Sequence, residues 1–163
     1  MPVRIMAFSA KTSINDPITP GGQTPAACNE TSAPDFSRPC TAPRTSTVRV
    51  ILGPQLGHFD AAGIDAFVST SWRVGLDSDR VGARLDGPRL THAGPSEIVS
   101  DGMVPGCIQV PPDGRPIVML SDCPTTGGYP KIACVVNDDL GLVAQAIPGR
   151  TAIRFTAIRI EDV

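Results

Sequence analysis

The segment from Ser121 to Ala133 concentrates groups that could bind a small anion. The groups in question belong to Thr125, Thr126, Gly127, Gly128, Tyr129 and Lys131. The two glycines can adopt backbone angles that other residues avoid, which lets successive N–H groups turn toward one point. The threonines add hydroxyl donors, and the lysine adds a positive charge. This chemistry suits a carboxylate or a phosphate, and a tight turn between two strands is the structural alternative.

Two further polar turns precede this segment. In Ser78–Gly87, Ser78 introduces Asp79 and Arg80, which could form an orienting pair whose guanidinium forks onto a substrate carboxylate. The alternative is an ion pair that fixes a turn. In Ser100–Pro111, Asp101 and Gly102 could bring the backbone close to a ligand. These two segments and the first one are predicted to meet at one concave surface.

Two more side chains offer specific contacts. Gln109 carries both a donor and an acceptor, which suits a planar urea-like or lactam group, although it could equally be a polar residue on the outer face of a strand. Tyr129 could stack on a ligand or plug the end of a barrel. Candidate sites of other kinds are absent: the chain has no Gly-x-Ser-x-Gly elbow, no phosphate-binding Gly-x-x-x-x-Gly-Lys-Ser/Thr loop and no His-Glu-x-x-His.

Composition narrows the class of protein. The chain has 163 residues, 41% of them hydrophobic and 18% charged, which fits one globular domain of ordinary size. Its net charge of −2 favours neither nucleic acid nor a membrane surface as a partner, and no apolar run is long enough to span a membrane. Without a signal-peptide pattern, the expected location is cytoplasmic. None of the five cysteines falls into a Cys-x-x-Cys pair, so no metal site is predicted.

The elements that must position these groups begin near residue 47. Residues 1–46 are rich in Pro, Ser and Thr without apolar periodicity, and we expect them to form a disordered leader outside the domain at 47–163. The predicted strands are Val48–Leu52, Trp72–Leu76, Cys107–Val110, Ile117–Leu120, Ile132–Val136 and a last strand containing Ile153, Phe155 and Ala157. Asp60 is predicted to cap one short helix, and Asp138 or Asp139 a second. The pattern predicts a mostly β, barrel-like domain with two short helices.

Four motifs in order resemble one known family. They are Val48–Gln55, Ser78–Gly87, Ser100–Pro111 and the Thr-Thr-Gly-Gly-Tyr-Pro-Lys run. Together they resemble the allophanate hydrolase subunit 2 family, also described as the family of the 5-oxoprolinase C subunit or of biotin-dependent carboxyltransferases, from about Thr47 to about Ile158. Ala83 and the Cys123-Pro124 pair depart from the usual pattern. Complete members carry a further folded portion ahead of the matched region, so the chain looks like a truncated member with an unrelated leader.

The resemblance implies a fold, an activity and partners. It implies a cyclophilin-like barrel that belongs to an ATP-dependent hydrolase opening 5-oxoproline or allophanate and that is inactive alone. ATP would act through the complex, and the partners would be companion proteins resembling the A and B subunits, together with a small amide or carboxylate substrate. Arg80 and Lys131 would then be the catalytic residues. The substrate-binding residues would be Ser78, Asp79, Asp101, Gly102, Gln109, Thr125, Thr126, Gly127, Gly128 and Tyr129.

The resemblance also leaves other functions open. Related domains form the carboxyltransferase part of urea carboxylase, and another relative counteracts a protein inhibitor of a histidine kinase. The chain could therefore be a carboxyltransferase domain, a non-catalytic regulatory module acting on a kinase-inhibitor partner, or a gene fragment without function. Identification of its partner would separate the first two classes from a hydrolase component.

Overall fold

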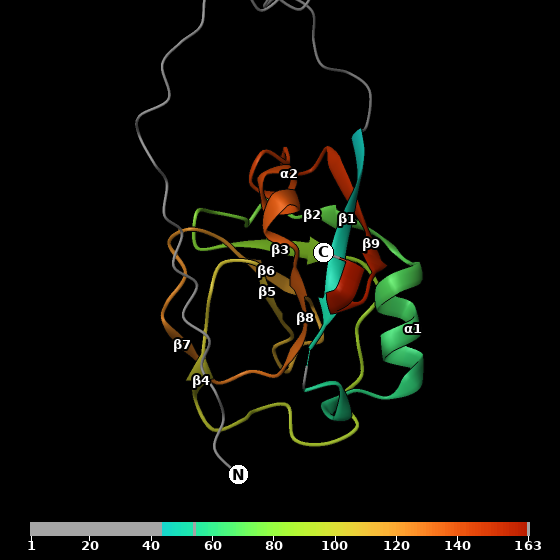
Figure 1. Ribbon diagram of the computed structural model, residues 1–163, viewed down its shortest axis with the longest axis vertical. Helices are drawn as coiled ribbons and strands as arrows, with labels where there is room; N and C mark the ends of the chain where they lie inside the picture. Colours follow the sequence, from blue (N-terminus) through green and yellow to red (C-terminus); the bar gives the residue numbers. More distant parts are fainter. Residues whose placement is uncertain (1–43, 54, 163) are drawn as a thin grey trace, which may run out of the picture. The chain divides into compact units, whose positions relative to one another are not determined.

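The computed structural model describes residues 44–53 and 55–162 (Figure 1). The strands are β1 (Arg44–Leu52), β2 (Ser71–Val74), β3 (Gly82–Asp86), β4 (Asp101–Gly102), β5 (Cys107–Gln109), β6 (Ile117–Met119), β7 (Thr126–Gly127), β8 (Lys131–Val135) and β9 (Thr151–Ala157). The helices are α1 (Ala61–Ser69) and α2 (Leu140–Ala144), with short 3₁₀ turns at Leu56–His58, Asn137–Asp139 and Ile160–Asp162.

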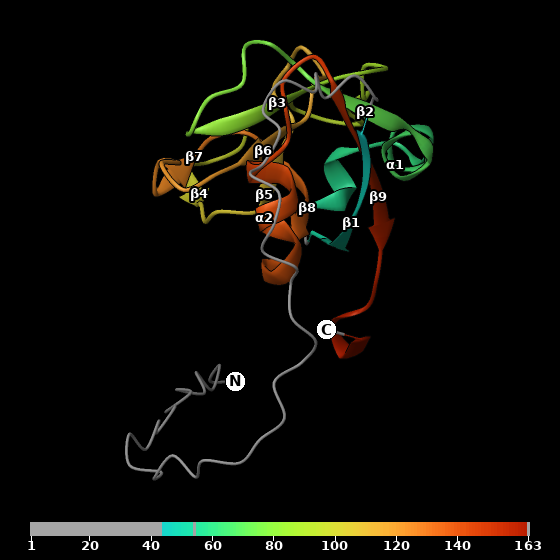
Figure 2. The same cartoon turned by 90° about the horizontal axis from the view of Figure 1, so that it is seen from above.

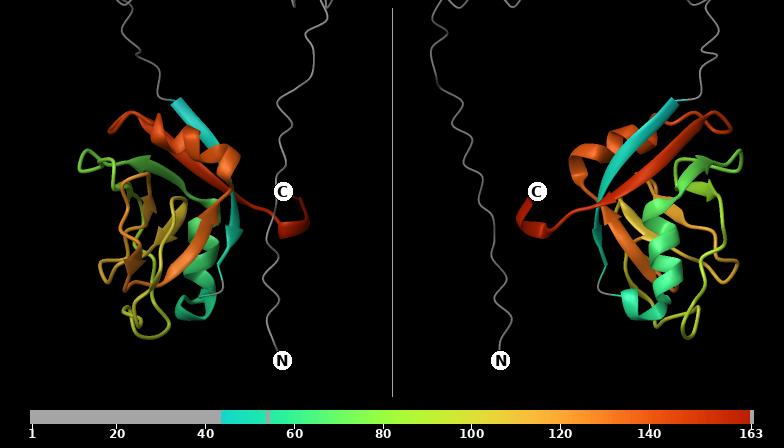
Figure 3. Two further views of the ribbon diagram at one scale, coloured as in Figure 1. Left: turned by 60° about the vertical axis from the view of Figure 1, so that its left-hand side comes forward. Right: turned by 90° about the vertical axis from the view of Figure 1, so that its right-hand side faces the viewer.

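Seven of the strands close into a barrel in the order β1-β8-β5-β6-β3-β2-β9. The first and last strands of this part of the chain close it, because β1 pairs in parallel with β9 from Arg44 opposite Thr151 to Val50 opposite Ala157. Both views of Figure 3 show these two strands side by side. The remaining barrel pairs are antiparallel. The predicted mostly β barrel with two short helices is confirmed.

The first strand starts earlier than the apolar pattern indicates. Val48 and Val50 are fully buried, as their alternation predicts, but β1 already begins at Arg44 and pairs with β9 over residues 44–46. The strand therefore begins three residues ahead of the predicted boundary between 46 and 47, and the division into a leader and a domain stays a prediction. Backbone hydrogen bonds to a distant strand define the start, and side-chain alternation does not report them. The rest of the predicted leader lies outside the described residues.

Helix α1 follows the predicted capping. The Asp60 carboxylate accepts a 2.6 Å hydrogen bond from the Gly63 N–H, and Phe67 on the buried face stacks on Phe155 with ring centroids 4.7 Å apart. Helix α2 differs, because Asp139 makes no side-chain capping bond. Its carboxylate instead binds Arg49, with a distance of 2.8 Å from Nη2 to Oδ1, so of the two predicted caps the one at Asp139 is wrong.

The second predicted strand is also shorter than expected. It ends at Val74, and the Leu76 side chain is 83% exposed. The Gly75 N–H donates to the Arg84 carbonyl, so the chain already turns toward β3 at this point. Apolar character at Leu76 therefore did not indicate burial.

The apolar residues divide into two clusters on the two faces of the barrel wall. The main core includes Val48, Trp72, Leu85, Ile108, Val118, Ile132 and Ile153 and extends to α1. Alternate residues on β5 and β6 belong instead to a second cluster of Met103, Cys107, Ile117 and Met119, with Cys123 and Cys134 packed against it. Because successive strand residues point to opposite faces, this outer cluster lies on the outside of the barrel.

A two-stranded ribbon accompanies the outer cluster. Strands β4 and β7 pair antiparallel, with Asp101 opposite Gly127 and Gly102 opposite Thr126. Figure 2 shows the ribbon and α1 on opposite sides of the barrel. Met103, directly after β4, belongs to the outer cluster, so the ribbon covers part of the barrel wall there. No helix within 44–53 and 55–162 is both long and apolar enough to cross a membrane.

Candidate functional site

The ribbon brings a carboxylate onto a buried lysine. Lys131 opens β8, and its Nζ lies 2.8 Å from Oδ2 of Asp101 on β4. The lysine side chain is only 10% exposed, whereas the carboxylate is 54% exposed. A buried ammonium requires a partner, because burial disfavours the charged form. Two of the segments that the sequence singled out therefore meet through a direct ion pair.

A glutamine that the sequence analysis did not select completes this contact. Gln55 donates from Nε2 to Asp101 Oδ2 over 3.1 Å and accepts the Lys131 backbone N–H at Oε1 over 2.8 Å. It thereby ties the start of β8 to the ribbon. The only sequence signal is its position at the end of the Val48–Gln55 motif, where it follows a strand and a Gly-Pro turn. We call Gln55, Asp101, Gln109, Gly127 and Lys131 the ribbon site.

The Lys131 contact also shifts the acidity of its partner. The hydrogen bond from Lys131 lowers the pKa of Asp101, with further lowering from the Gly102 N–H, from the lysine charge and from Gln55. Asp101 is therefore held as a carboxylate and keeps the ammonium of Lys131 paired. An ammonium has three N–H donors, and Asp101 accepts one of them.

Gln109 places an unused acceptor beside these groups. It is the register partner of Lys131 across β5 and β8. Its Oε1 atom is buried without a hydrogen-bond partner among the described residues. A Cβ built on Gly127 would lie 3.3 Å from this oxygen and would overlap the terminal methyl of Met103. The missing side chain of Gly127 thus lets the Met103 methyl and the Gln109 oxygen lie close to the ribbon backbone. The oxygen lacks a donor, and such an atom costs free energy unless a ligand satisfies it.

Gly127 and Gly128 do not adopt the left-handed backbone angles that would turn their N–H groups toward one point. Among the described residues, Gly106, Gly114 and Gly149 have positive φ, and Gly127 and Gly128 do not. The Thr125 and Gly128 carbonyls accept N–H groups of Met103 and Ile98 over 2.9 Å and 2.8 Å, which holds the ribbon to the preceding loop. Gly127 therefore matters because it has no side chain, and the left-handed backbone angles predicted to turn its N–H and that of Gly128 toward one point do not occur.

The remaining residues of this segment are less enclosed. Thr125 and Thr126 are exposed on and beside β7, while Tyr129 is half-buried. Gly102 lies on β4 opposite Thr126, and a Cβ built on it would meet nothing within 4 Å. These positions surround the ribbon site without a recorded hydrogen bond to Lys131 or Gln109.

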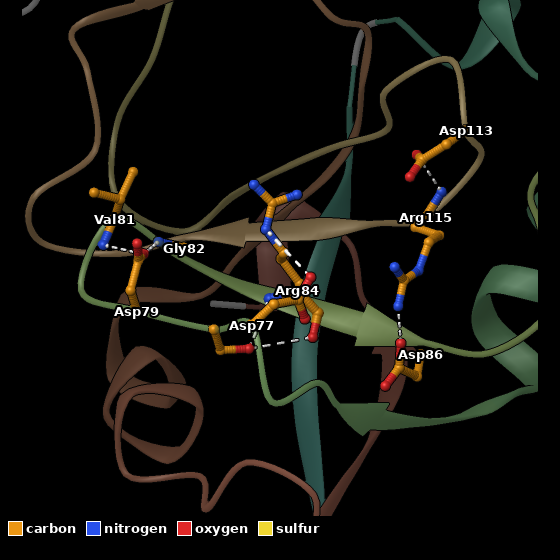
Figure 4. Close-up of polar contacts among 9 residues, drawn as sticks. Asp77, Asp79, Val81, Gly82, Arg84, Asp86, Asp113 and Arg115 are labelled. Carbon is orange, nitrogen blue, oxygen red and sulfur yellow. Dashed lines mark hydrogen bonds and ion pairs between the residues drawn. The ribbon is translucent and has the colours of Figure 1, made fainter.

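The third predicted segment forms a different structure at the β2–β3 turn. The Asp79 carboxylate accepts the N–H groups of Val81 and Gly82 over 2.9 Å and 3.1 Å (Figure 4). Ser78 Oγ accepts the Arg84 N–H over 3.0 Å. Both side chains therefore build the turn. The predicted Asp79–Arg80 pair does not form, because backbone donors occupy the carboxylate oxygen and Arg80 turns elsewhere.

Arg80 pairs with the loop after β6. Its Nε lies 3.0 Å from Asp122 Oδ2, and its side chain is 83% exposed. Ser78, Asp79 and Arg80 line a pocket of 780 Å³ whose other wall is apolar and includes Leu140 and Val143 of α2. Lys131, Asp101, Gln109 and the Thr125–Tyr129 residues do not line it. We call this the turn pocket, and the predicted single surface is thus divided into a ribbon site and a turn pocket.

Comparisons with known proteins agree with the fold. The family profile described as "Carboxyltransferase domain, subdomain A and B" matches residues 12–157. The match begins ahead of the expected boundary near residue 47, and the unrelated character of the leader stays a prediction. In the described part of the chain, no group of three or more His, Cys, Asp or Glu side chains is placed to hold a metal ion.

Individual relatives and one solved structure fit the same assignment. The chain is 41% identical to the 5-oxoprolinase C subunit of Escherichia coli over 115 residues, which is 71% of this chain and 37% of the relative. It is 44% identical over 91 residues to the 5-oxoprolinase C subunit of Haemophilus influenzae, 56% of this chain and 29% of the relative. The crystal structure of Kluyveromyces lactis urea carboxylase superposes with a TM-score of 0.67 at 28% identity, covering 73% of this chain and 11% of that chain.

The family assignment rests on the length of the profile match together with the order of the motifs. The matched region contains the barrel, the ribbon site and the turn pocket described above. The chain spans about a third of the length of the curated relatives that it matches. It belongs to the carboxyltransferase domain family of subdomains A and B.

Proposed function

We propose that this chain contributes the amide-binding site of a component like the 5-oxoprolinase C subunit, which works in an ATP-dependent hydrolase together with companion proteins. The carrying observation is the ribbon site: a buried Lys131 ammonium and the unpartnered Oε1 of Gln109 lie on paired strands. The identity to the 5-oxoprolinase relative from Escherichia coli supports the choice of reaction.

The chemistry of the two groups fits an amide. An amide or lactam presents a carbonyl oxygen that accepts hydrogen bonds and an N–H that donates one. Lys131 supplies a charged donor for the oxygen, and Gln109 Oε1 supplies an acceptor for the N–H. When the amide is attacked or phosphorylated, charge develops on its oxygen, and a donor held in place by Asp101 stabilises that charge.

The wider enzyme supplies what these residues lack. The sequence has no phosphate-binding loop, so ATP would bind on a companion protein. Nor does the ribbon site offer a nucleophile–base pair of the serine hydrolase kind. The chain alone is therefore expected to open neither 5-oxoproline nor allophanate.

A reconstitution experiment tests the proposal. The full-length chain is mixed with the A and B subunits of a 5-oxoprolinase-type enzyme, and glutamate formation from 5-oxoproline is measured with and without ATP. We expect ATP-dependent glutamate only in the complete mixture. Absence of product in the complete mixture, with all three proteins shown to associate, would contradict the assignment of 5-oxoproline as substrate.

Carboxyl transfer to urea is the second candidate, favoured by the superposition on urea carboxylase. The ribbon site would accept urea through the same donor and acceptor, so the two functions differ in the partner. The discriminating measurement supplies carboxybiotin and urea in place of ATP and 5-oxoproline. The carboxyl group of carboxybiotin is labelled, and its loss from carboxybiotin is followed. A positive result there with a negative one for 5-oxoproline would assign the carboxyltransferase reaction.

A further inference from the structure

Three cysteines that lie far apart in the sequence meet on the outer face of the barrel. Cys107 opens β5, Cys134 lies on β8 and Cys123 lies in the loop before β7. All three belong to the outer cluster with Met103 and Met119. The sequence indicated only separate small buried residues at two of these positions, because strand register is invisible in the spacing.

Cys107 and Cys134 are direct partners across two strands. The Val135 N–H donates to the Gly106 carbonyl over 2.8 Å, so ladder hydrogen bonds flank this pair. Flanked pairs of this kind have Cα atoms about 4.5 Å apart, which falls within the range that a disulfide spans. The two strands therefore hold the thiols in a position from which a bond can form without a change of register.

The electrostatic surroundings divide the two thiols into unequal roles. Interaction with the Cys134 thiol lowers the pKa of Cys107, against the opposing effect of burial. The Val104 N–H and the charge of Lys131 lower it further. The same contact and burial raise the pKa of Cys134. These opposite directions assign Cys107 the part of the attacking thiolate and Cys134 the part of the resolving thiol.

We propose that Cys107 and Cys134 form a redox-active dithiol that hydroperoxides convert to a disulfide. The Cys107 thiolate attacks one peroxide oxygen, the O–O bond breaks, and the departing hydroxide takes up a proton to give water and a Cys107 sulfenic acid. The Cys134 sulfur then attacks Cys107 Sγ, the S–O bond breaks, and the Cys134 proton leaves with the hydroxide as a second water. Two thiols are oxidised and one peroxide is reduced.

The position of the bond ties this chemistry to the ribbon site. Cys107 lies on the same strand as Gln109 and on the same face, and Cys134 lies on the same strand as Lys131. Cys107 itself is 7% exposed, while Cys134 is partly exposed, so a small oxidant can reach the pair from its β8 side. Oxidation would cross-link the strands that carry both proposed amide-binding groups.

Peptide mapping tests the pairing. The full-length chain with Cys28→Ser and Cys40→Ser is treated with hydrogen peroxide, alkylated under denaturing conditions and digested without reduction. Trypsin alone leaves Cys107 and Cys123 in one peptide, because Arg115 precedes Pro116. Added cleavage before Asp113 and Asp122 places each of the three cysteines in its own peptide. We expect a Cys107–Cys134 cross-link that a reductant reverses.

Matched variants make the result decisive. Cys134→Ser should abolish the cross-link and leave Cys107 as a trapped sulfenic acid, which a dimedone probe labels. Cys123→Ser should leave the cross-link and its rate unchanged, and near-native circular dichroism of each variant shows that the fold persists. A dominant Cys107–Cys123 cross-link, or unlinked cysteines after complete peroxide consumption, would overturn the proposal.

Discussion

The ribbon site and the turn pocket use the same types of residue in opposite ways. In the ribbon site the cation is buried, since Lys131 is 10% exposed, and its partner Asp101 lies at the surface. At the turn pocket, Arg80 is 83% exposed and pairs with an accessible loop carboxylate. A buried charge that loses its partner is destabilising, whereas an exposed pair contributes about 0–1 kcal/mol. Burial thus separates a cation enclosed against its partner from one that braces a turn at the surface.

The two regions also differ in whether donors within the protein satisfy their side-chain oxygens. Asp79 and Ser78 direct their oxygens at backbone N–H groups of their own turn. At the ribbon site, Gln109 Oε1 has no such donor among the described residues. A polar group satisfied inside its turn has little capacity left for a ligand, and one that is buried and unsatisfied gains most from binding one. The ribbon site is therefore the better candidate for substrate binding, although the 780 Å³ hollow belongs to the turn pocket.

The largest effect is expected from Lys131→Ala. In the reconstituted enzyme, loss of this donor should cost about 2–4 kcal/mol of transition-state stabilisation, the range seen when one oxyanion donor is removed. The quantity to measure is kcat/KM for the ATP-dependent reaction, with the thermal midpoint as a check on folding. An unchanged rate in a folded variant would remove Lys131 from catalysis and favour the regulatory interpretation of the family resemblance.

Gly127→Ala should have the next largest effect. Its new Cβ would overlap Met103 and approach Gln109 Oε1, so the Met103 side chain must shift beside the acceptor. We expect weaker binding of 5-oxoproline or urea, measured by chemical-shift perturbation in the labelled full-length chain. Gly102→Ala is the matched control on the facing strand, because its Cβ would meet nothing within 4 Å. Equal loss of binding in both variants would show that a methyl group anywhere on the ribbon weakens binding, and that the position of Gly127 beside Gln109 has no special role.

Acid pH should weaken the Asp101–Lys131 ion pair of the ribbon site. The pKa of Asp101 is lowered in the folded state, so its contribution to stability is complete above the unfolded pKa of about 3.9 and is lost as the pH falls through the folded value. Asp139, whose pKa Arg49 lowers, adds to the same trend. Urea unfolding between pH 6 and pH 3, pH values chosen to bracket about 3.9, should show a smaller decrease in Asp101→Asn than in the unmodified chain.

Arg80→Ala should have the smallest effect on stability. An exposed ion pair to Asp122 predicts a loss below about 1 kcal/mol in urea unfolding. The catalytic role inferred for Arg80 from the family resemblance stays a prediction, and kcat/KM of the same variant tests it. A rate loss as large as that of Lys131→Ala would show that the turn pocket joins the reaction in the assembled enzyme and would break the contrast between the two regions.

The sequence predicted the parts of the site better than their arrangement. Val48 and Val50 alternate clearly because one face of β1 meets the core, and Asp60 caps α1 through a local bond. By contrast, all three residues of β6 are buried, since the outer cluster covers the face that would otherwise meet water. A strand buried on both sides has no period of two, so its outward residues cannot be identified from the pattern.

Long-range pairing explains the remaining differences. Gln55 binds Lys131 and Asp101 across 76 and 46 positions of sequence, and nothing in its neighbourhood indicates that contact. The Cys107–Cys134 partnership likewise depends on the register of β5 against β8, which contains an irregularity at Ile108 and Gln109. Motif resemblance brought Asp101 and Lys131 into one set of candidates, but the same set included Arg80, whose place only the barrel geometry decided.

The parallel pairing of β1 with β9 has a consequence for synthesis on the ribosome. The strand that completes the barrel is emitted more than 90 positions after the one it pairs with, as the register from Arg44–Thr151 to Val50–Ala157 requires. Until Thr151–Ala157 leaves the exit tunnel, β1 has one open edge and Phe67 lacks the ring of Phe155. Contacts this distant make for slow folding, so the nascent chain spends most of its synthesis as an unclosed sheet that can pair with other strands.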